Sequence, residues 1–448
     1  MQRRLALYGI MPRFQVRRQP QAQLLPPSPR KPPQKSMPQA MSKSSHQPLF
    51  LFSGCGPQRW SLLNHDTDAV GLQPHHRHER YAAHLCGRTA KRDAARVLAW
   101  IDRQLQCGRA VAGWIGYEVG AALEDLPLAR RRDPLPDADL IAFAPEDLHT
   151  QAMARIATIP PQLTNLPKDL LKQRQRFCRK VRAALESIGR GEVYQVNLSV
   201  RLALPIRGQM HALSVGQLLA GIQAAQPVPM AMVFRGQNYQ LLSGSMERFL
   251  GVSGTTVRSR PIKGTLPRGA DAQSDAEMAR QLRASPKECA ENTMIVDMVR
   301  NDLRRACQMG SVQVTTMLTA VAYKTLWHLE SEVQATLQQP QTHTHLLTAT
   351  LPPASVTGCP KIQAMRVIER LESNRRGPYC GALGMVLPDG RADWSVGIRQ
   401  AILWPDRAVV RSGAGIVADS VPAAEWTEVC LKTQSALRLL QVLEGQLP

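Results

Sequence analysis

The chain has 448 residues, of which 44% are hydrophobic and 20% are charged, proportions typical of a soluble globular enzyme. No uninterrupted apolar run approaches the roughly 18 residues of a membrane-spanning helix, so no membrane partner is expected. The nine cysteines are scattered without any Cys-x-x-Cys spacing. This scatter argues against a disulfide framework or structural zinc site and favours a reducing, cytoplasmic location.

The net charge of +21 is unevenly distributed along the chain. The first 47 residues contain nine Lys and Arg and no Asp or Glu, which leaves +12 for the other 401. Because this segment is also rich in Pro, Gln and Ser, it is interpreted as a disordered extension over residues 1–46. An over-long start ahead of Met37 or Met41 and an organelle transit peptide are the alternatives. The body shows no aromatic residues interleaved with basic ones, so no nucleic-acid partner is expected.

The remaining sequence predicts a folded body in two parts. Its first strand pattern begins near Gln47, and a loose stretch over 126–168 contains seven prolines. We therefore place a boundary near residue 165. It separates an N-terminal subdomain, residues 47–165, from a larger domain, residues 166–448.

Helix and strand patterns alternate through this body. Residues 92–107 are predicted as a helix and residues 111–117 as a buried strand with close backbone packing. Apolar residues at helical spacing then end at Gly189, and an apolar/polar alternation follows over 196–202. The pattern continues to the end of the chain and predicts an α+β or mixed α/β fold.

A first Glu-x-x-Glu pair lies at the start of a predicted helix that Ser285 caps. Glu288 stands where it completes a capping box, so capping alone is one interpretation of this residue. Glu291 shares an apolar face with Ile295 and Met298, four and seven residues further on. A carboxylate on that face must be paired, protonated or bound to a metal, because an unpaired buried charge is too costly.

A second pair, Glu425 and Glu428, opens the C-terminal helix. The two residues lie one turn apart, so both carboxylates can point toward one spot. Two helices that each present carboxylates suit a hard cation with retained waters, which favours Mg²⁺ over zinc. Either pair alone is more typical of a solvated helix face, and only the two together indicate a metal site.

Several further segments suit an anionic ligand. Residues 261–265 (Pro-Ile-Lys-Gly-Thr) place Lys263 between a strand pattern and a turn. Residues 357–361 precede a predicted helix, whose free N–H groups would hold a carboxylate. Residues 413–415 (Gly-Ala-Gly) are predicted as a backbone nest. Arg399 follows a strand pattern, from which it would bind a carboxylate with both nitrogens, although a surface salt bridge is the alternative.

On these and neighbouring motifs, the region from about residue 177 to 443 resembles the chorismate-utilising enzymes. That family includes anthranilate, isochorismate, salicylate and aminodeoxychorismate synthases. The resemblance implies two intertwined α/β subdomains with a β-sandwich core. The matching stretches, in chain order, are residues 194–199, 245–249, 261–265, 290–292, 299–303, 357–361 and 413–420.

Two positions distinguish the branches of this family. Anthranilate synthases typically have alanine at the position of Lys263, whereas aminodeoxychorismate synthase component I has Pro-Ile-Lys-Gly-Thr as here. Isochorismate and salicylate synthases have a water-activating lysine where this chain has Gln195. The resemblance therefore favours the aminodeoxychorismate synthase branch, in para-aminobenzoate and folate biosynthesis, with anthranilate synthase component I as the alternative.

The resemblance also implies roles for individual residues. Glu291 and Glu428 would hold Mg²⁺, with Glu288 and Glu425 acting through water. Lys263 would attack C2 of chorismate, and Glu247 would be the general acid and base. The residues implied to bind the substrate are Gly264, Thr265, His328, Thr357, Tyr379, Arg399, Gly413, Gly415 and Lys432.

The ammonia for such a reaction requires a second protein. Class I glutaminases carry a nucleophilic cysteine in a Gly-rich elbow with a distant His-x-Glu. The only similar segment here, Gly54-Cys55-Gly56, lacks that context and is interpreted as a turn. A separate glutamine amidotransferase subunit is therefore expected as the partner.

Overall fold

The computed structural model describes residues 49–53, 59–60, 68–73, 76–129, 134–152, 170–206, 213–324, 326–338 and 342–444. The predicted tail 1–46, the predicted boundary near residue 165 and the Gly54–Gly56 turn lie outside these residues. Residues Gln47–Pro448 form one compact unit. Among the described helices, none combines the length and apolar character needed to cross a membrane.

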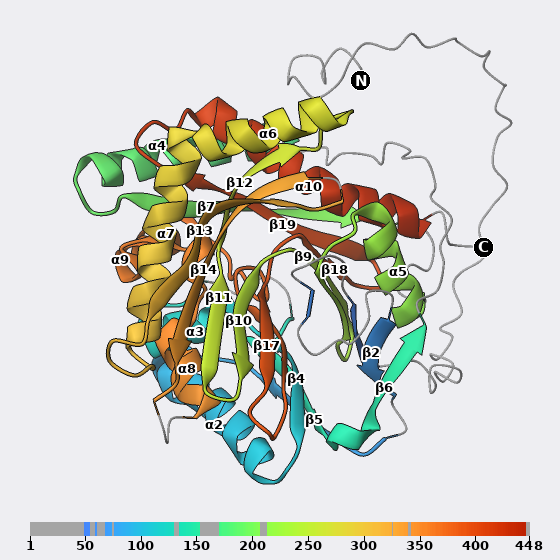
Figure 1. The fold of residues 1–448 in the computed structure, drawn as a ribbon. Helices are drawn as coiled ribbons and strands as arrows, with labels where there is room; N and C mark the ends of the chain where they lie inside the picture. Colours follow the sequence, from blue (N-terminus) through green and yellow to red (C-terminus); the bar gives the residue numbers. More distant parts are fainter. Residues whose placement is uncertain are drawn as a thin grey trace, which may run out of the picture. The chain divides into compact units, whose positions relative to one another are not determined.

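Two large antiparallel sheets form the body of this unit (Figure 1). The first has the strand order β15-β7-β19-β18-β9-β8-β1-β2-β6. Its strands are β15 Gly358–Cys359, β7 Gln195–Pro205, β19 Arg407–Ile416, β18 Gln400–Leu403, β9 Gln240–Ser245, β8 Met230–Arg235, β1 Phe50–Ser53, β2 Asp68–Leu72 and β6 Leu148–Ala152.

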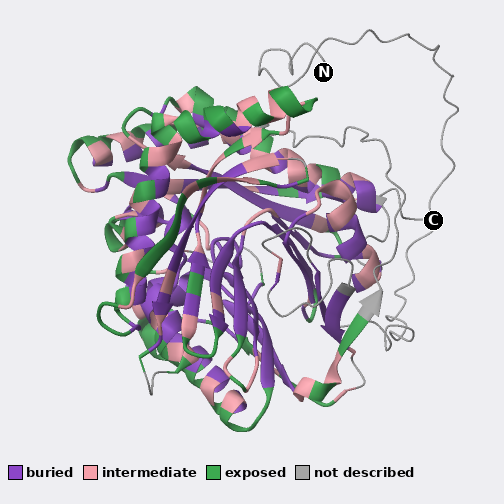
Figure 2. Cartoon of the chain, in the orientation of Figure 1, coloured by how far each residue is buried: buried purple, intermediate pink, exposed green. Residues whose placement is uncertain are grey.

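The second sheet has the order β12-β14-β11-β10-β17-β16-β4-β5-β3, with β13 paired to the outer side of β14. β13 is largely exposed along its length, unlike the central strands (Figure 2). The strands are β12 Ile262–Pro267, β14 Leu326–Thr336, β13 Gln313–Ala322, β11 Thr256–Arg260, β10 Arg248–Ser253, β17 Ala392–Val396, β16 Ala382–Val386, β4 Ala110–Ile115, β5 Ala138–Phe143 and β3 His78–Ala83.

Helices cover the outer faces of the two sheets. In the described chain, α4, α5, α9 and α10 contact the first sheet, and α2, α6 and α7 contact the second, where α8 packs on α2 and α7. Their bounds are α2 Ala90–Gln106, α3 Tyr117–Leu123, α4 Leu170–Gly189, α5 Val215–Ala225, α6 Ala272–Ala284, α7 Pro286–Arg304, α8 His343–Thr350, α9 Lys361–Leu371 and α10 Pro422–Glu444, with short 3-10 turns η1 Gly87–Thr89, η2 Pro145–Asp147 and η4 Ala354–Val356.

Both sheets take strands from both ends of the chain, which confirms the mixed, intertwined fold. The segment before residue 153 supplies β1, β2 and β6 to the first sheet and β3, β4 and β5 to the second. Apolar side chains from the two sheets meet in one buried cluster, for example Phe52 and Phe234 from the first with Trp114 and Phe143 from the second. This cluster is the core of a β-sandwich.

The local predictions agree with these elements. The helix predicted over 92–107 is α2, and the buried strand predicted over 111–117 is β4, every residue of which is buried. The helix predicted to stop at Gly189 is α4. β7 presents apolar residues at alternate positions, because one of its faces packs on helices while the other carries polar side chains.

A buried ion pair connects the end of α9 to β7 of the first sheet and to the η4 turn. Arg376 and Glu372 are only 3% and 4% exposed, and they form a two-pronged contact at 2.8 and 2.9 Å. Arg376 also donates to the carbonyl oxygens of Val356 and Asn197, at 3.2 and 2.6 Å. Each charge is thereby satisfied away from water, and the loop after α9 is held against β7.

Replacing Arg376 by Met should strongly destabilise the protein. The change leaves Glu372 buried without its main counter-charge, which costs about 3–5 kcal/mol of unfolding free energy. Arg391→Met is the matched control, because its pair with Asp389 is exposed and is worth about 0–1 kcal/mol. Urea unfolding midpoints of the two variants would be compared. Similar midpoints would mean that the buried pair contributes little.

Candidate active site

A cavity of about 690 Å³ lies among β12, β14, α7, α10 and β19. Thirteen of the fifteen residues predicted to form the site line it, although they come from widely separated parts of the chain. Strand pairing brings them together, since β12 pairs with β14 and β19 pairs with β7 over ten residues. The thirteen are Glu247, Lys263, Gly264, Thr265, Glu288, Glu291, His328, Tyr379, Arg399, Gly413, Gly415, Glu428 and Lys432.

Lys263 projects from β12 toward helix α7. Its Nζ lies 3.7 Å from Oε2 of Glu291. The pairing of β12 with β14 shifts register between Lys263 and Thr265, where Gly264 has φ +81°. A Cβ at Gly264 would lie 3.1 Å from Oε2 of Glu288, so glycine serves both the left-handed turn and the close approach of α7.

Glu247 also lines the cavity, from the link between β9 and β10, and is 5% exposed. Burial raises the pKa of its carboxyl to about 7, while a hydrogen bond with Ser355 and the charge of Lys263 oppose that rise. A carboxyl with this pKa holds or releases a proton near neutral pH. It therefore meets the requirement for general acid and base chemistry.

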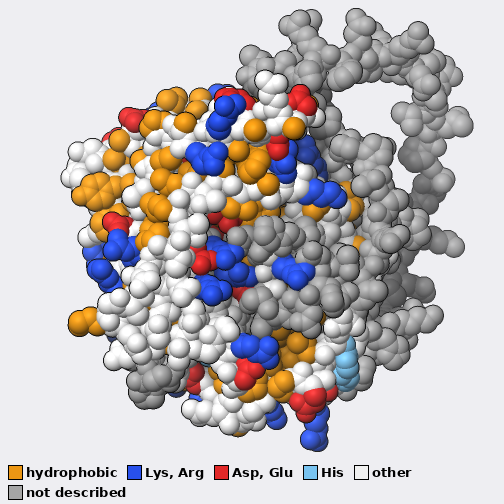
Figure 3. Space-filling view, viewed as in Figure 1, with side chains coloured by type: hydrophobic (Ala, Val, Ile, Leu, Met, Phe, Trp, Pro, Cys, Tyr) orange, Lys and Arg blue, Asp and Glu red, His pale blue; other side chains and the backbone are white. Residues whose placement is uncertain are grey.

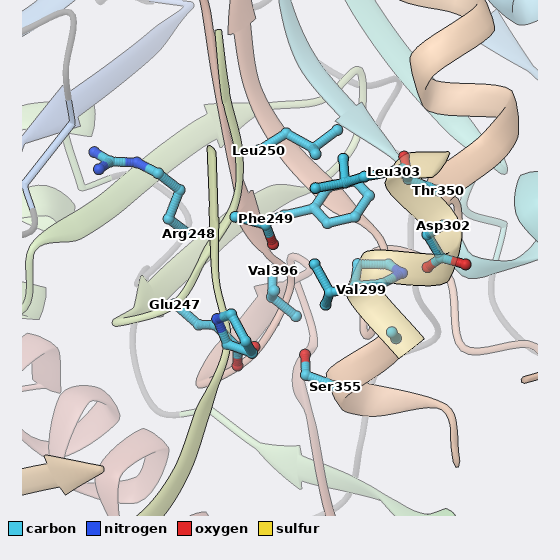
Figure 4. A pocket seen from close by; sticks show the side chains of 14 residues that line it. Glu247, Arg248, Phe249, Leu250, Val299, Asp302, Leu303, Thr350, Ser355 and Val396 are labelled. Carbon is cyan, nitrogen blue, oxygen red and sulfur yellow. The ribbon is translucent and has the colours of Figure 1, made fainter. Parts of the chain in front are cut away.

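A second, much smaller cavity lies directly behind Glu247. Glu247 and Ser355 line both cavities. Figure 4 shows them at one end of the inner cavity, with the Asp302 carboxylate at the other and Val299 and Val396 between. Its volume of about 10 Å³ is close to the minimum that holds one water molecule. The space beside Glu247 on this side therefore has room for no more than about one water molecule.

The predicted metal-binding glutamates have different hydrogen-bond partners. Oε2 of Glu291 accepts a hydrogen bond of 3.1 Å from Nε2 of Gln195. Glu428 Oε1 accepts from Lys432 at 2.5 Å. Glu425 does not line the cavity: one of its oxygens accepts from Ser420 at 2.7 Å and the other is buried without a partner.

These carboxylates fit a hard cation in chemistry. They offer only oxygen donors, which Mg²⁺ prefers. Burial, followed by the charge of Glu291, raises the pKa of Glu288, and a divalent cation would relieve both effects. Across the described residues, no three His, Cys, Asp or Glu side chains already stand close enough together to hold an ion. Mg²⁺ binding therefore stays a prediction.

The capping role predicted for Glu288 is only half present. Ser285 does cap α7, since its hydroxyl accepts from the Glu288 N–H at 3.4 Å. The Ser285 N–H, however, donates to the Leu282 carbonyl oxygen at 3.4 Å rather than to Glu288. The carboxylate of Glu288 instead lies against Gly264 at the cavity. The capping-box interpretation is therefore wrong, and Glu288 faces the ligand space.

Positive side chains form another part of the cavity wall. Arg399, at φ +51°, donates from Nη1 to the Lys432 carbonyl oxygen at 3.2 Å and to the Ser435 hydroxyl at 3.3 Å. Lys432 donates to the carbonyl oxygen of Gly413 at 3.2 Å. Because both of these acceptors are neutral, the charge of Arg399 is available to an anionic ligand.

His328 is an uncharged part of the same wall. It is 1% exposed, and its Nδ1 lies 3.0 Å from Oγ1 of Thr265. Burial, together with the charge of Arg399, lowers the pKa of His328 to about 4. The ring is therefore neutral at pH 7, which suits contact with an apolar ring face or a hydrogen bond to the ligand.

The prediction of a backbone nest at Gly413-Ala414-Gly415 is wrong. These residues belong to β19, and neither glycine has a positive φ. The glycines serve close packing instead, since a Cβ at Gly415 would lie 2.7 Å from Nε2 of Gln195 and 3.5 Å from Nζ of Lys263. The sequence Gly-Ala-Gly contains only small residues, so its pattern could not distinguish a strand from a loop.

The predicted carboxylate site at the start of α9 is not at this cavity. Thr357 is fully buried and does not line it. Its hydroxyl donates to the carbonyl oxygens of Pro353 and Ala354. Lys361 is also engaged elsewhere, with Asp302 at 2.5 Å. The structure adds Ser355 and Lys287 to the lining. Lys287 could have been predicted from the sequence, because it precedes Glu291 by four residues and therefore lies on the same helix face.

The sequence matches the chorismate binding enzyme family over residues 47–438. The chain belongs to this family. It is 30% identical to aminodeoxychorismate synthase component 1 of Klebsiella aerogenes over 442 residues, covering 88% of this chain and 96% of that protein. It is 33% identical to the Escherichia coli protein of the same name over 350 residues, covering 73% and 76%.

Other members of the family are equally similar. Anthranilate synthase component 1 of Streptomyces coelicolor is 32% identical over 380 residues, with 75% of this chain and 73% of that protein covered. Among solved structures, anthranilate synthase component I of Streptococcus pneumoniae superposes with a TM-score of 0.64 at 23% identity, covering 90% and 94%. These comparisons support a chorismate-utilising enzyme without separating its branches.

Glu247→Gln should stabilise the protein increasingly as pH rises. The folded-state pKa of about 7 exceeds the ordinary value of 4.5. The stability linked to this proton is therefore complete below about pH 4.5 and lost as pH rises through 7. A neutral amide avoids that loss, which is at most about 3 kcal/mol. We expect the melting temperature of the variant to exceed that of the unmodified protein near pH 8.5 and to converge near pH 5. Glu277→Gln on the exposed face of α6 is the control, and a pH-independent difference would contradict the argument.

Proposed function

We propose that this member of the family is an aminodeoxychorismate synthase component I, which converts chorismate and ammonia to 4-amino-4-deoxychorismate. The observation that carries the proposal is the placement of Lys263. It lines the ligand cavity next to Glu291, together with a carboxyl, Glu247, that can exchange a proton near neutral pH. A lysine there has a chemical role that alanine cannot supply.

In the first step, the neutral amine of Lys263 attacks C2 of chorismate. Both ring double bonds shift, and the C4–O bond breaks. Glu247 gives its proton to the departing hydroxyl, which leaves as water. The result is a covalent C2–N adduct, in which the lysine nitrogen carries the positive charge and Glu247 is ionised.

In the second step, ammonia attacks C4 and the C2–N bond breaks. The electron pair of that bond returns to Lys263, which leaves as a neutral amine. The new C4 ammonium group then gives a proton to Glu247. Every proton and electron pair is thereby restored, and the enolpyruvyl group stays on the ring.

The other cavity residues would hold the substrate in place. Arg399 and Tyr379 suit the enolpyruvyl carboxylate, and Lys432 would add a further positive contact. Glu291 and Glu428, with Glu288 and Glu425 behind them, would hold Mg²⁺. When bound, that ion neutralises the ring carboxylate and withdraws electrons from the ring.

A glutamine amidotransferase subunit is the proposed source of ammonia. The similarity to two proteins named component 1 supports a chain that works with a further subunit. A glutaminase site is also not recognisable in the sequence. The second candidate function is that of anthranilate synthase component I, favoured by the similarity to proteins of that name. That reaction aminates C2 and eliminates pyruvate, so its chemistry does not require Lys263 as a nucleophile.

The products formed from chorismate, Mg²⁺ and high ammonium test the proposal. We expect an aminated product that keeps the enolpyruvyl group, and an enzyme adduct detectable by intact mass. Lys263→Ala should abolish the adduct and lower kcat by at least about 100-fold, because the nucleophile is lost. Lys324→Ala is the control, since this lysine does not line the cavity. Anthranilate plus pyruvate would assign the chain to the other branch, and full activity of Lys263→Ala would exclude covalent catalysis.

Glu428→Gln tests the metal site. Removing one charged oxygen ligand should raise the Mg²⁺ concentration for half-maximal activity at least about tenfold, since affinity follows ligand charge and number. Direct Mg²⁺ binding, measured by calorimetry without substrate, should weaken in parallel. Glu369→Gln, on α9 and outside the cavity, is the control. An unchanged Mg²⁺ requirement in Glu428→Gln would place the ion elsewhere.

A further inference from the structure

Two histidines meet far from the catalytic cavity, where the chain crosses between the two sheets. His76 lies in the connection from β2 of the first sheet to β3 of the second. His149 is the second residue of β6, which follows the return connection through η2. β6 and β3 end their respective sheets. Figure 3 shows histidine side chains at the surface on the side of the molecule where Figure 1 places β6.

The two imidazoles face each other through their Nε2 atoms, which are 3.4 Å apart. The ring planes are inclined by 72°, with centroids 4.8 Å apart. Two bonds of about 2.05 Å at a tetrahedral angle place two nitrogens about 3.3–3.4 Å apart, as in a zinc site. The observed spacing therefore accepts a metal ion between the rings with little movement of either.

Asp147 sets the orientation of His76. Nδ1 of His76 lies 3.3 Å from the Asp147 carboxylate and 3.2 Å from the carbonyl oxygen of the same residue. A proton on Nδ1 directs the Nε2 lone pair toward His149. Metal-binding histidines commonly donate their second nitrogen to a carboxylate or carbonyl in this way.

From this geometry we propose that His76 and His149 form a binding site for a borderline divalent transition metal such as Zn²⁺ or Ni²⁺. The ion would take the place of the proton between the two Nε2 atoms, and that proton would pass to solvent. Imidazole nitrogen is a preferred ligand of these metals. Since no third His, Cys, Asp or Glu of the described chain converges on this spot, water completes the coordination.

The site would link the two crossing connections of the β-sandwich. β2 and β6 are already paired there, with Gly71 opposite His149. His76 belongs to the chain segment that leaves β2 for the other sheet. An ion held by both histidines would tie that segment to the edge of the first sheet. Because it binds only the folded protein, it would raise the melting temperature.

Calorimetric titration with NiCl₂ tests the site on the full chain. All proteins carry Cys86→Ser and Cys107→Ser, which remove two exposed thiols, and the buffer contains millimolar Mg²⁺ to occupy the carboxylate site. His149→Ala and His76→Ala should each lose the same single equivalent of Ni²⁺ and the associated rise in melting temperature. Asp147→Asn should keep that equivalent with about tenfold weaker binding.

The matched control is His84→Ala, an exposed histidine on the connection after β3. It should keep the full stoichiometry and the full thermal shift. Retention of the equivalent in His149→Ala would overturn the proposal, as would its loss in His84→Ala. Melting temperatures without Ni²⁺ identify any variant whose fold is damaged. Catalytic activity plays no part in the readout, so the result is independent of the proposed reaction.

Discussion

The charges buried around the ligand cavity have to balance one another, and the architecture of the site follows from that constraint. Glutamates from α7 and α10 face lysines from β12 and α10, together with Arg399. Each group alone would be too costly to bury. Lys263 lies against Glu291, and Lys432 against Glu428, so each of these two carboxylates has a cation within 4 Å. The proposed dianionic substrate and divalent cation would add opposite charges to this set, with little change in its net charge.

That balance depends on how closely the elements approach one another. Gly264 allows α7 to lie against β12, and Gly415 leaves room for Gln195 and Lys263 beside β19. Both glycines belong to stretches that carry the family resemblance. Gly264 needs its positive φ as well as the space. Gly415 needs only the space, which explains why an extended strand serves where a nest had been predicted.

Among the described residues, Glu247 forms no ion pair, unlike Glu291 and Glu428, which lie within 4 Å of Lys263 and Lys432. Burial dominates its surroundings, and Ser355 provides a hydrogen bond. Glu247 lines two cavities, one large enough for a ligand and one about the size of a single water molecule. The larger cavity thus contains one carboxyl with a raised pKa and one with a lowered pKa. Glu428, held below its ordinary pKa by Lys432 against the effect of burial, stays charged, whereas Glu247 exchanges a proton.

The sequence by itself determined the mixed α/β class, the bounds of α2 and the end of α4, which depend on local periodicity and helix stop signals. Through its family resemblance, it also indicated thirteen of the residues around the cavity. It did not determine that Thr357 and Glu425 turn away from the cavity, that Glu288 faces it instead of closing a capping box, or that residues 413–415 are a strand. It also left Ser355 and the His76–His149 pair unnoticed. Only the tertiary structure decided these points, because each depends on which partner a polar group finds across strand pairings and helix contacts distant in sequence.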